Sequence, residues 1–173
     1  MNRLLPLAFA AAALFAAPPA FAQNLDALVA AEQQVTAAWD ATPLTFRKTL
    51  FATAIEAYGV YTEKSGTTFA PGEPIVVYAE PVGYGYTTNA QGKYGFGFDF
   101  DLVVKTEDGE IVAGKDGFAH FELSSNAQNR EFLVSLTLTL NEAPAGNYVL
   151  EYLAHDIASD ETATISMPFT ISE

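Results

Sequence analysis

The amino-acid sequence predicts an all-β protein, an antiparallel β-sandwich of seven to nine strands preceded by a short N-terminal helix. The first observation is an unbroken alternation of side-chain types over residues 132–140, which is the period of a half-buried strand. The second is the same alternation over residues 94–104, where an aromatic or aliphatic residue occupies every other position. The third is that clusters of Gly, Pro, Asn and Asp separate most of these runs, as is typical of sandwiches.

The first 22 residues have the pattern of a cleavable signal peptide. Arg3 supplies a positive start, residues 4–17 are apolar, and Ala20-Phe21-Ala22 fits the small-x-small cleavage signal. We expect cleavage after Ala22 and no membrane span in the rest of the chain. The chain then divides into a signal peptide (1–22), an N-terminal helix and linker (23–43) and a sandwich domain (44–173). The protein is accordingly expected in the periplasm or outside the cell.

The composition excludes several kinds of partner and of chemistry. The 173 residues include 8 Lys and Arg against 21 Asp and Glu, which gives a formal net charge of −13. This charge argues against nucleic acid and against anionic membrane surfaces as partners. The absence of cysteine rules out disulfides, a thiolate nucleophile and cysteine zinc ligands. The domain must therefore be stabilised by packing.

Residues 25–39 are expected to form a helix. Asn24 is a suitable N-cap, and Pro43 prevents a long continuation. Five large apolar side chains recur near helical spacing, and they are Leu25, Leu28, Val29, Val35 and Trp39. We expect this apolar side to cover one end or edge of the sandwich like a lid, with Trp39 as its anchor. The alternative is a helix that binds a partner or acts as a spacer.

The first half of the sandwich domain is less regular than the second. Residues 44–58 fit a helix as well as a strand, and we favour a strand because the rest of the chain is β-rich. Residues 59–63 are expected to add a short edge strand. After a turn at 69–74, residues 75–80 are apolar on both faces, which predicts a central strand. Residues 81–86 continue it irregularly, with glycines that suggest a bulge or a bend.

The second half of the domain alternates regularly and is built of hairpins. Asp108-Gly109 is a hairpin signal that predicts a type I′ turn. Pro168 places the last strand at a sheet edge. The turn cluster at 141–146 is interpreted as a corner where the chain leaves one sheet for the other. The strands are expected at residues 93–105, 110–113, 117–123, 130–140, 148–154 and 163–171.

The corner segment Pro144-Ala-Gly146-Asn-Tyr148-Val-Leu150 resembles the P-x-G-x-Y-x-L step of bacterial exported Ig-like and fibronectin-III-like domains. The resemblance covers roughly residues 70–172 and implies an Ig-like sandwich. It also implies that Tyr148 forms a tyrosine corner, with a buried ring and a hydroxyl bonded to the backbone a few residues upstream. Such folds host adhesins, chaperones, enzyme appendages and sugar-binding modules, so the resemblance implies no single function.

A repeated Gly-aromatic pattern is the most unusual feature of the composition. It occurs at residues 83–86 and again from Tyr94, and the two segments look like arms of one hairpin. One interpretation is a shallow aromatic platform, formed by Tyr84, Tyr86 and Tyr94, that stacks on sugars or on a peptide. The other, which we favour, is packing, in which glycine beside aromatic rings relieves crowding in a twisted sheet.

The sequence offers few candidates for metal binding or catalysis. Asp156, Asp160 and Glu161 could bind calcium at one end of the sandwich, although solvation of a hairpin loop is the favoured explanation of these acids. The two histidines, His120 and His155, lie in no recognisable catalytic or metal-binding motif. We therefore expect no enzymatic activity and no cofactor, with calcium as the one candidate ion.

These features favour an exported, non-catalytic binding or interaction module of the bacterial cell envelope. Its expected partner is an envelope protein or polysaccharide. Two alternatives are left open, a carbohydrate-binding module that uses the Gly-Tyr hairpin and a calcium-stabilised structural domain.

Overall fold

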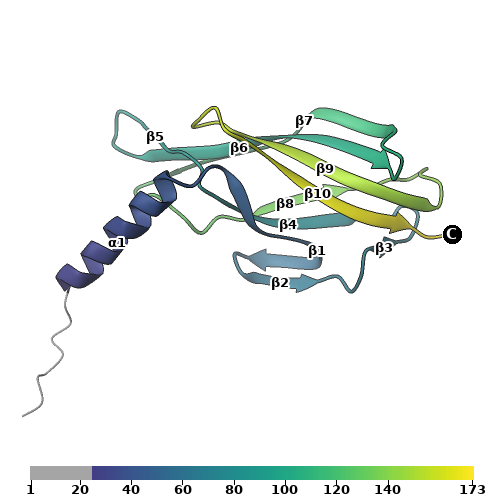
Figure 1. The fold of residues 1–173 in the computed structure, drawn as a ribbon, viewed down its shortest axis with the longest axis horizontal. Helices are drawn as coiled ribbons and strands as arrows, with labels where there is room; N and C mark the ends of the chain where they lie inside the picture. Colours follow the sequence, from purple (N-terminus) through teal and green to yellow (C-terminus); the bar gives the residue numbers. More distant parts are fainter. Residues whose placement is uncertain (1–24) are drawn as a thin grey trace, which may run out of the picture.

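The computed structural model describes residues 25–173, and the predicted signal peptide with its cleavage site lies outside them. The described part is a two-layer β-sandwich from which one helix, α1 (Leu25–Asp40), projects at one end (Figure 1). Within residues 25–173 there are ten strands. The prediction of seven to nine did not include β3 (Thr68–Phe69) and β5 (Thr87–Thr88), which are two residues long and have no alternation to reveal them. No helix in this range is both long and apolar enough to span a bilayer.

Two sheets face each other, and their strand pairs are antiparallel except for the parallel pair of β3 with β10. The four-stranded sheet has the order β2-β1-β4-β8, and the other has the order β3-β10-β9-β6-β5, with β7 also paired to β6. In the first sheet the bounds are β1 (Thr45–Ala57), β2 (Val60–Glu63), β4 (Ile75–Val82) and β8 (Val134–Leu138). In the second they are β6 (Tyr94–Thr106), β7 (Ile111–Ser125), β9 (Gly146–Asp156) and β10 (Thr162–Ile171). The segment 44–58, which fitted a helix or a strand, is thus mostly strand β1.

The chain passes between the sheets where the sequence predicted a corner. β8 lies in the four-stranded sheet and β9 in the other, so the turn cluster at 141–146 makes the crossing. The chain also crosses between the sheets from β4 to β5 and from β7 to β8. With these crossings, β1-β4-β8 face β10-β9-β6-β7, which is the Greek-key arrangement of an Ig-like sandwich.

Three local predictions were wrong in detail. The two strands expected at 110–113 and 117–123 form the single strand β7. The strand expected at 130–140 is hydrogen-bonded as a strand only at Val134–Leu138, the stretch that pairs with Ile75–Ala79 of β4. The β6–β7 turn is not of type I′, which needs two successive residues with positive φ. Within this turn only Gly109 has a positive φ, of 87°, because no described non-glycine residue has one.

The interior is filled by aromatic and aliphatic side chains from both sheets. Phe96, Phe98 and Phe100 on β6 are at most 1% exposed, and each buried ring removes about 150–250 Å² from water. Tyr148 confirms the tyrosine corner, because its hydroxyl donates to the carbonyl of Pro144 over 2.8 Å and its ring is 7% exposed. The ring stacks on Phe169 with 5.5 Å between centroids. Packing of this kind stabilises a domain that has no disulfide.

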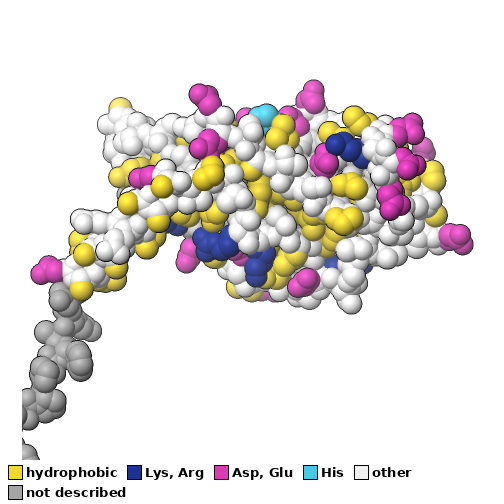
Figure 2. Space-filling view, in the orientation of Figure 1, with side chains coloured by type: hydrophobic (Ala, Val, Ile, Leu, Met, Phe, Trp, Pro, Cys, Tyr) yellow, Lys and Arg dark blue, Asp and Glu magenta, His cyan; other side chains and the backbone are white. Residues whose placement is uncertain are grey.

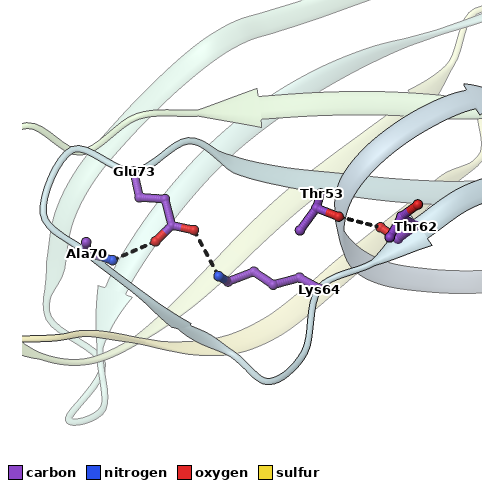
Figure 3. Close-up of polar contacts among 5 residues, drawn as sticks. All are labelled: Thr53, Thr62, Lys64, Ala70 and Glu73. Carbon is purple, nitrogen blue, oxygen red and sulfur yellow. Dashed lines mark hydrogen bonds and ion pairs between the residues drawn. The ribbon is translucent and has the colours of Figure 1, made fainter.

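The connection between β2 and β4 is closed by one ion pair (Figure 3). Lys64 Nζ lies 2.9 Å from Glu73 Oε1, and the other Glu73 oxygen accepts the backbone N–H of Ala70 over 2.8 Å. The ammonium also lies 4.6 Å from the centroid of Phe69, a fully buried ring. Beside this loop, the Thr53 hydroxyl donates to the carbonyl of Thr62 across the β1–β2 hairpin.

The helix does not form the expected lid. Its axis leads away from the sandwich (Figure 1), and Trp39 in the last turn is its only buried residue. The end of the sandwich is already closed by its own side chains, among them Tyr84 and Phe132, whose rings pack together. Only the last turn of α1 therefore has a surface to bury.

Candidate functional site

The Gly-Tyr segment and the acidic hairpin loop, which are far apart in sequence, meet at the base of α1. A cleft of about 290 Å³ lies there, and its walls include Trp39, Tyr84, Tyr86 and Glu161. The backbone N–H of Gly85 donates to Asp156 across this junction, over 2.7 Å. The structure therefore combines parts of both sequence-predicted sites in one region.

Tyr84 is a core residue and not part of an exposed platform. Its ring is 1% exposed, stacks on Phe96 at 5.3 Å and meets Trp39 edge-on at 4.9 Å. Its hydroxyl donates to the carbonyl of Asn129 over 2.5 Å. Burial raises the pKa of this hydroxyl well above its ordinary value. The exposed row of three rings that the platform interpretation requires does not form, and at Tyr84 the favoured packing interpretation is confirmed.

Tyr86 and Tyr94 are half-buried and lie next to each other. Their ring centroids are 6.2 Å apart, in an edge-to-face arrangement. The Tyr86 hydroxyl donates to the same Asn129 carbonyl as that of Tyr84, and burial raises the Tyr86 pKa. Only two of the three candidate rings therefore reach the surface.

Trp39 anchors α1, as the sequence predicted. Its indole N–H donates to the carbonyl of Tyr84 over 2.9 Å. Arg130, just before β8, adds a second tie, since its Nη2 donates to the Thr36 hydroxyl over 2.6 Å. The guanidinium of Arg130 also lies 5.9 Å from the Trp39 ring, within the range of a cation–π contact. These contacts hold the last turn of α1 to the sandwich.

The outer turns of α1 expose large apolar side chains. We call Leu25, Leu28, Val29 and Val35 the α1 stripe, and their exposed fractions are 67%, 55%, 42% and 52% respectively. Figure 2 shows hydrophobic side chains along this projecting helix. Among the described residues this is the longest run of unburied large apolar side chains on a single element. The sequence predicted the stripe, and the structure shows that the sandwich leaves it uncovered.

The three candidate calcium ligands have separate structural roles. Asp156 is buried and accepts hydrogen bonds from Gly85, Ala158 and Ser159. Glu161 accepts the backbone N–H of Leu44, and Asp160 is exposed. In the described part of the chain, no three His, Asp or Glu side chains are gathered closely enough to hold a metal ion.

Both histidines lie in one cross-strand row that sequence analysis missed. Asp99 on β6 is directly opposite His120 on β7 and His155 on β9. His120 Nδ1 lies 2.6 Å from Asp99 Oδ1, and this contact raises the His120 pKa. His155 Nε2 lies 2.9 Å from Asp101 Oδ2. The pKa of Asp101 is lowered by the N–H of Gly117 and then by His155. These residues are brought together only by the pairing register of β6 with β7 and β9. The local sequence around each residue does not reveal that register.

Comparisons with known proteins leave the function to be argued from this geometry. None of the family models compared matches the chain, and a search of curated proteins finds no similar sequence.

Proposed function

We propose that this protein is an exported, non-catalytic interaction module of the bacterial cell envelope, and that α1 is the element that its partner protein binds. The observation that carries the proposal is the α1 stripe on a helix that projects from the sandwich. Soluble proteins seldom leave several large apolar side chains together in water unless the surface is used.

The stripe has the geometry of a helix that lies in a groove. Successive residues of a helix are about 100° apart, so the α1 stripe falls within an arc of about 120°. Spacing of this kind provides the anchors by which amphipathic helices bind apolar grooves. Trp39 lies on the same side, so the stripe continues from the anchored turn outward.

A partner would also stabilise the helix. Most helices in proteins are stabilised by packing of their apolar face rather than by helix propensity alone. In α1 only the last turn packs on the sandwich. A groove that covered the α1 stripe would supply the missing packing.

Charge supports a protein with a basic apolar groove as the partner. The helix carries Asp26, Glu32 and Asp40 and has no Lys or Arg, and Glu32 lies in the middle of the stripe's arc. Helices that lie on membranes are rich in Lys and Arg on their polar side, which is the opposite pattern. A second copy of this acidic chain would bring like charges together. A groove with a Lys or Arg opposite Glu32 avoids both difficulties.

The test is affinity capture from the cell envelope with three versions of residues 23–173, each tagged at the C-terminus. These are the unaltered chain, a stripe variant (Leu28→Glu with Val35→Glu) and a control variant (Gln33→Glu with Gln34→Glu). The two variants make the same charge change at exposed positions of the same helix, but only the first lies on the stripe. Circular dichroism checks that all three are folded.

We expect the unaltered chain and the control to recover one protein near one-to-one. The stripe variant should recover at least about tenfold less, because two buried apolar contacts are lost. Equal recovery by the stripe variant would refute α1 as the binding element. Retention on envelope polysaccharide with no protein recovered would refute the proposal in favour of sugar binding.

A further inference from the structure

The outer edge of β8 is an unpaired strand edge at the side of the sandwich. Among the described residues β8 is paired with β4 alone, through five consecutive pairs from Ile75–Leu138 to Ala79–Val134 without a register shift. In an antiparallel strand the backbone groups alternate between two sides. Those on the outer side of β8 meet no strand in the described part of the chain. A regular edge of this kind is complementary to one more strand.

The other edges of the two sheets are protected and β8 is not. The four-residue strand β2 pairs with β1 through two register shifts. β10 contains Pro168, and β3 covers its end at Thr170 and Ile171. β7 carries Lys115 and Asp116 and pairs irregularly with β6. Short strands, bulges, prolines and charges all block added strands. The sequence of β8 is VSLTL, which contains no proline and no charged residue. Its modest length is its only protection against an added strand.

A groove lies beside the C-terminal end of β8. It has a volume of about 610 Å³ and extends from Val112 and Ala113 on β7 to the loop that contains Leu140 and Pro144, with Tyr148 in its wall. Val112 is 49% exposed. Side chains alternate across a strand, so one side of a strand added to β8 would face the other sheet, and its inward residue nearest Leu138 would lie next to this groove.

The groove is acidic at its rim. Glu142 lines it, as does Thr106, which leads into the β6–β7 hairpin with Glu107, Asp108 and Glu110. No Lys or Arg is among its lining residues. Figure 2 shows acidic side chains gathered at the end of the sandwich opposite α1. A segment that binds here would therefore gain from Lys or Arg.

We propose that the β8 edge and this groove bind an extended, basic peptide segment of a partner protein as an added strand. Main-chain hydrogen bonds to β8 hold the segment, and an apolar side chain fills the groove beside Val112. A second copy of this chain is the less suitable occupant, because edge-to-edge pairing would bring two acidic rims together. This surface is separate from α1 and does not depend on the function proposed for that helix.

The probe is a synthetic peptide of alternating threonine and valine with arginine at both ends, titrated into ¹⁵N-labelled chain 23–173. One matched peptide has glutamate at both ends, and another has N-methyl groups along one backbone edge. Val112→Ser removes an apolar contact from the groove. Ile111→Ser is its control, because Ile111 is exposed but does not line the groove.

We expect the arginine peptide to shift the amide signals of Val134–Leu138 and to slow their hydrogen exchange. Val112→Ser should weaken binding about tenfold, and Ile111→Ser less than about twofold. The glutamate and N-methylated peptides should bind at least about tenfold more weakly. The α1 stripe variant should bind the peptide normally, which separates this proposal from the previous one.

Three results would overturn the proposal. The first is equal binding of the N-methylated peptide, because strand addition needs its backbone N–H groups. The second is that the amide signals of β8 do not change, even if those of the acidic β6–β7 hairpin do. The third is self-association of the chain through β8 in sedimentation, which would assign this edge to a second copy.

Discussion

The carboxylate of Asp156 accepts the backbone N–H of Gly85 over 2.7 Å, although the two residues are 71 positions apart. The same Asp156 oxygen accepts the Ser159 hydroxyl over 2.7 Å, and the other oxygen accepts the N–H of Ala158 over 2.9 Å. One buried acid thus ties the irregular segment after β4 to the β9–β10 hairpin. Its hydrogen bonds offset the cost of burying a charge.

Asp156→Ala is expected to lower the free energy of unfolding by roughly 2–4 kcal/mol, because the N–H groups of Gly85 and Ala158 lose their acceptor. Urea denaturation measures the change. Asp160→Ala is the control at an exposed position in the same loop and should stay within about 0.5 kcal/mol. Equal losses in the two variants would contradict the structural role of Asp156.

Calcium is expected to leave the melting temperature of the chain unchanged. Both oxygens of Asp156 are occupied by hydrogen-bond donors, and Glu161 is bonded to the backbone of Leu44. An ion that bound only the folded state would raise the melting temperature. The measurement is thermal unfolding in millimolar calcium and again with chelator. A rise that the chelator reverses would restore the calcium-stabilised alternative.

Two tyrosine-to-phenylalanine variants should differ in their effect on the free energy of unfolding. The Tyr152 hydroxyl is fully buried and has no hydrogen-bond partner in the described part of the chain, whereas that of Tyr148 donates to Pro144. We expect Tyr152→Phe to leave stability unchanged or to raise it by up to about 1 kcal/mol, and Tyr148→Phe to lower it by about 0.5–1.5 kcal/mol. Chemical denaturation compares the two, and similar losses in both would count against this assignment.

His120 should titrate above its ordinary pKa of about 6.5, because its contact with Asp99 favours the protonated ring. A raised pKa in the folded state makes the pair stabilising below the unfolded-state pKa, and this contribution is lost as pH rises through the folded-state pKa. NMR titration of the ring protons measures the shift. Asp99→Asn should remove most of the shift and leave the smaller part that Glu122 contributes. Asp101→Asn, which alters the partner of His155, should leave the His120 shift in place.

Glu73 should contribute stability that is lost in acid. Its pKa is lowered by the hydrogen bond from Lys64 and then by the N–H of Ala70. A lowered pKa makes the contribution fully present above the unfolded-state value of about 4.3 and lost as pH falls through the lower folded-state value. Glu73→Gln should cost roughly 0.5–1.5 kcal/mol near pH 7. The difference from the unaltered chain should shrink below about pH 4 in urea titrations, and a constant difference would argue against the ion pair.

Local patterns predicted the elements whose cause is itself local. The alternation over residues 94–104 predicted β6, and the Pro144–Leu150 segment predicted the tyrosine corner of Tyr148. The same patterns overestimated the length of β8, because they carry no information on how far it pairs with β4, and that pairing is confined to Val134–Leu138. They also predicted a type I′ turn at Asp108-Gly109, whereas only the glycine takes a positive φ.

The sequence by itself determined the sandwich, its corner and the amphipathic character of α1, because the period of apolar residues depends only on backbone geometry. Burial and pairing were decided by the tertiary structure. Tyr84 and Tyr86 are two positions apart in one pattern, yet only Tyr84 is fully buried. The row of Asp99 with two histidines, the uncovered α1 stripe and the free edge of β8 arise in the same way. Each depends on which distant segments meet, and a local pattern carries no information about those long-range contacts.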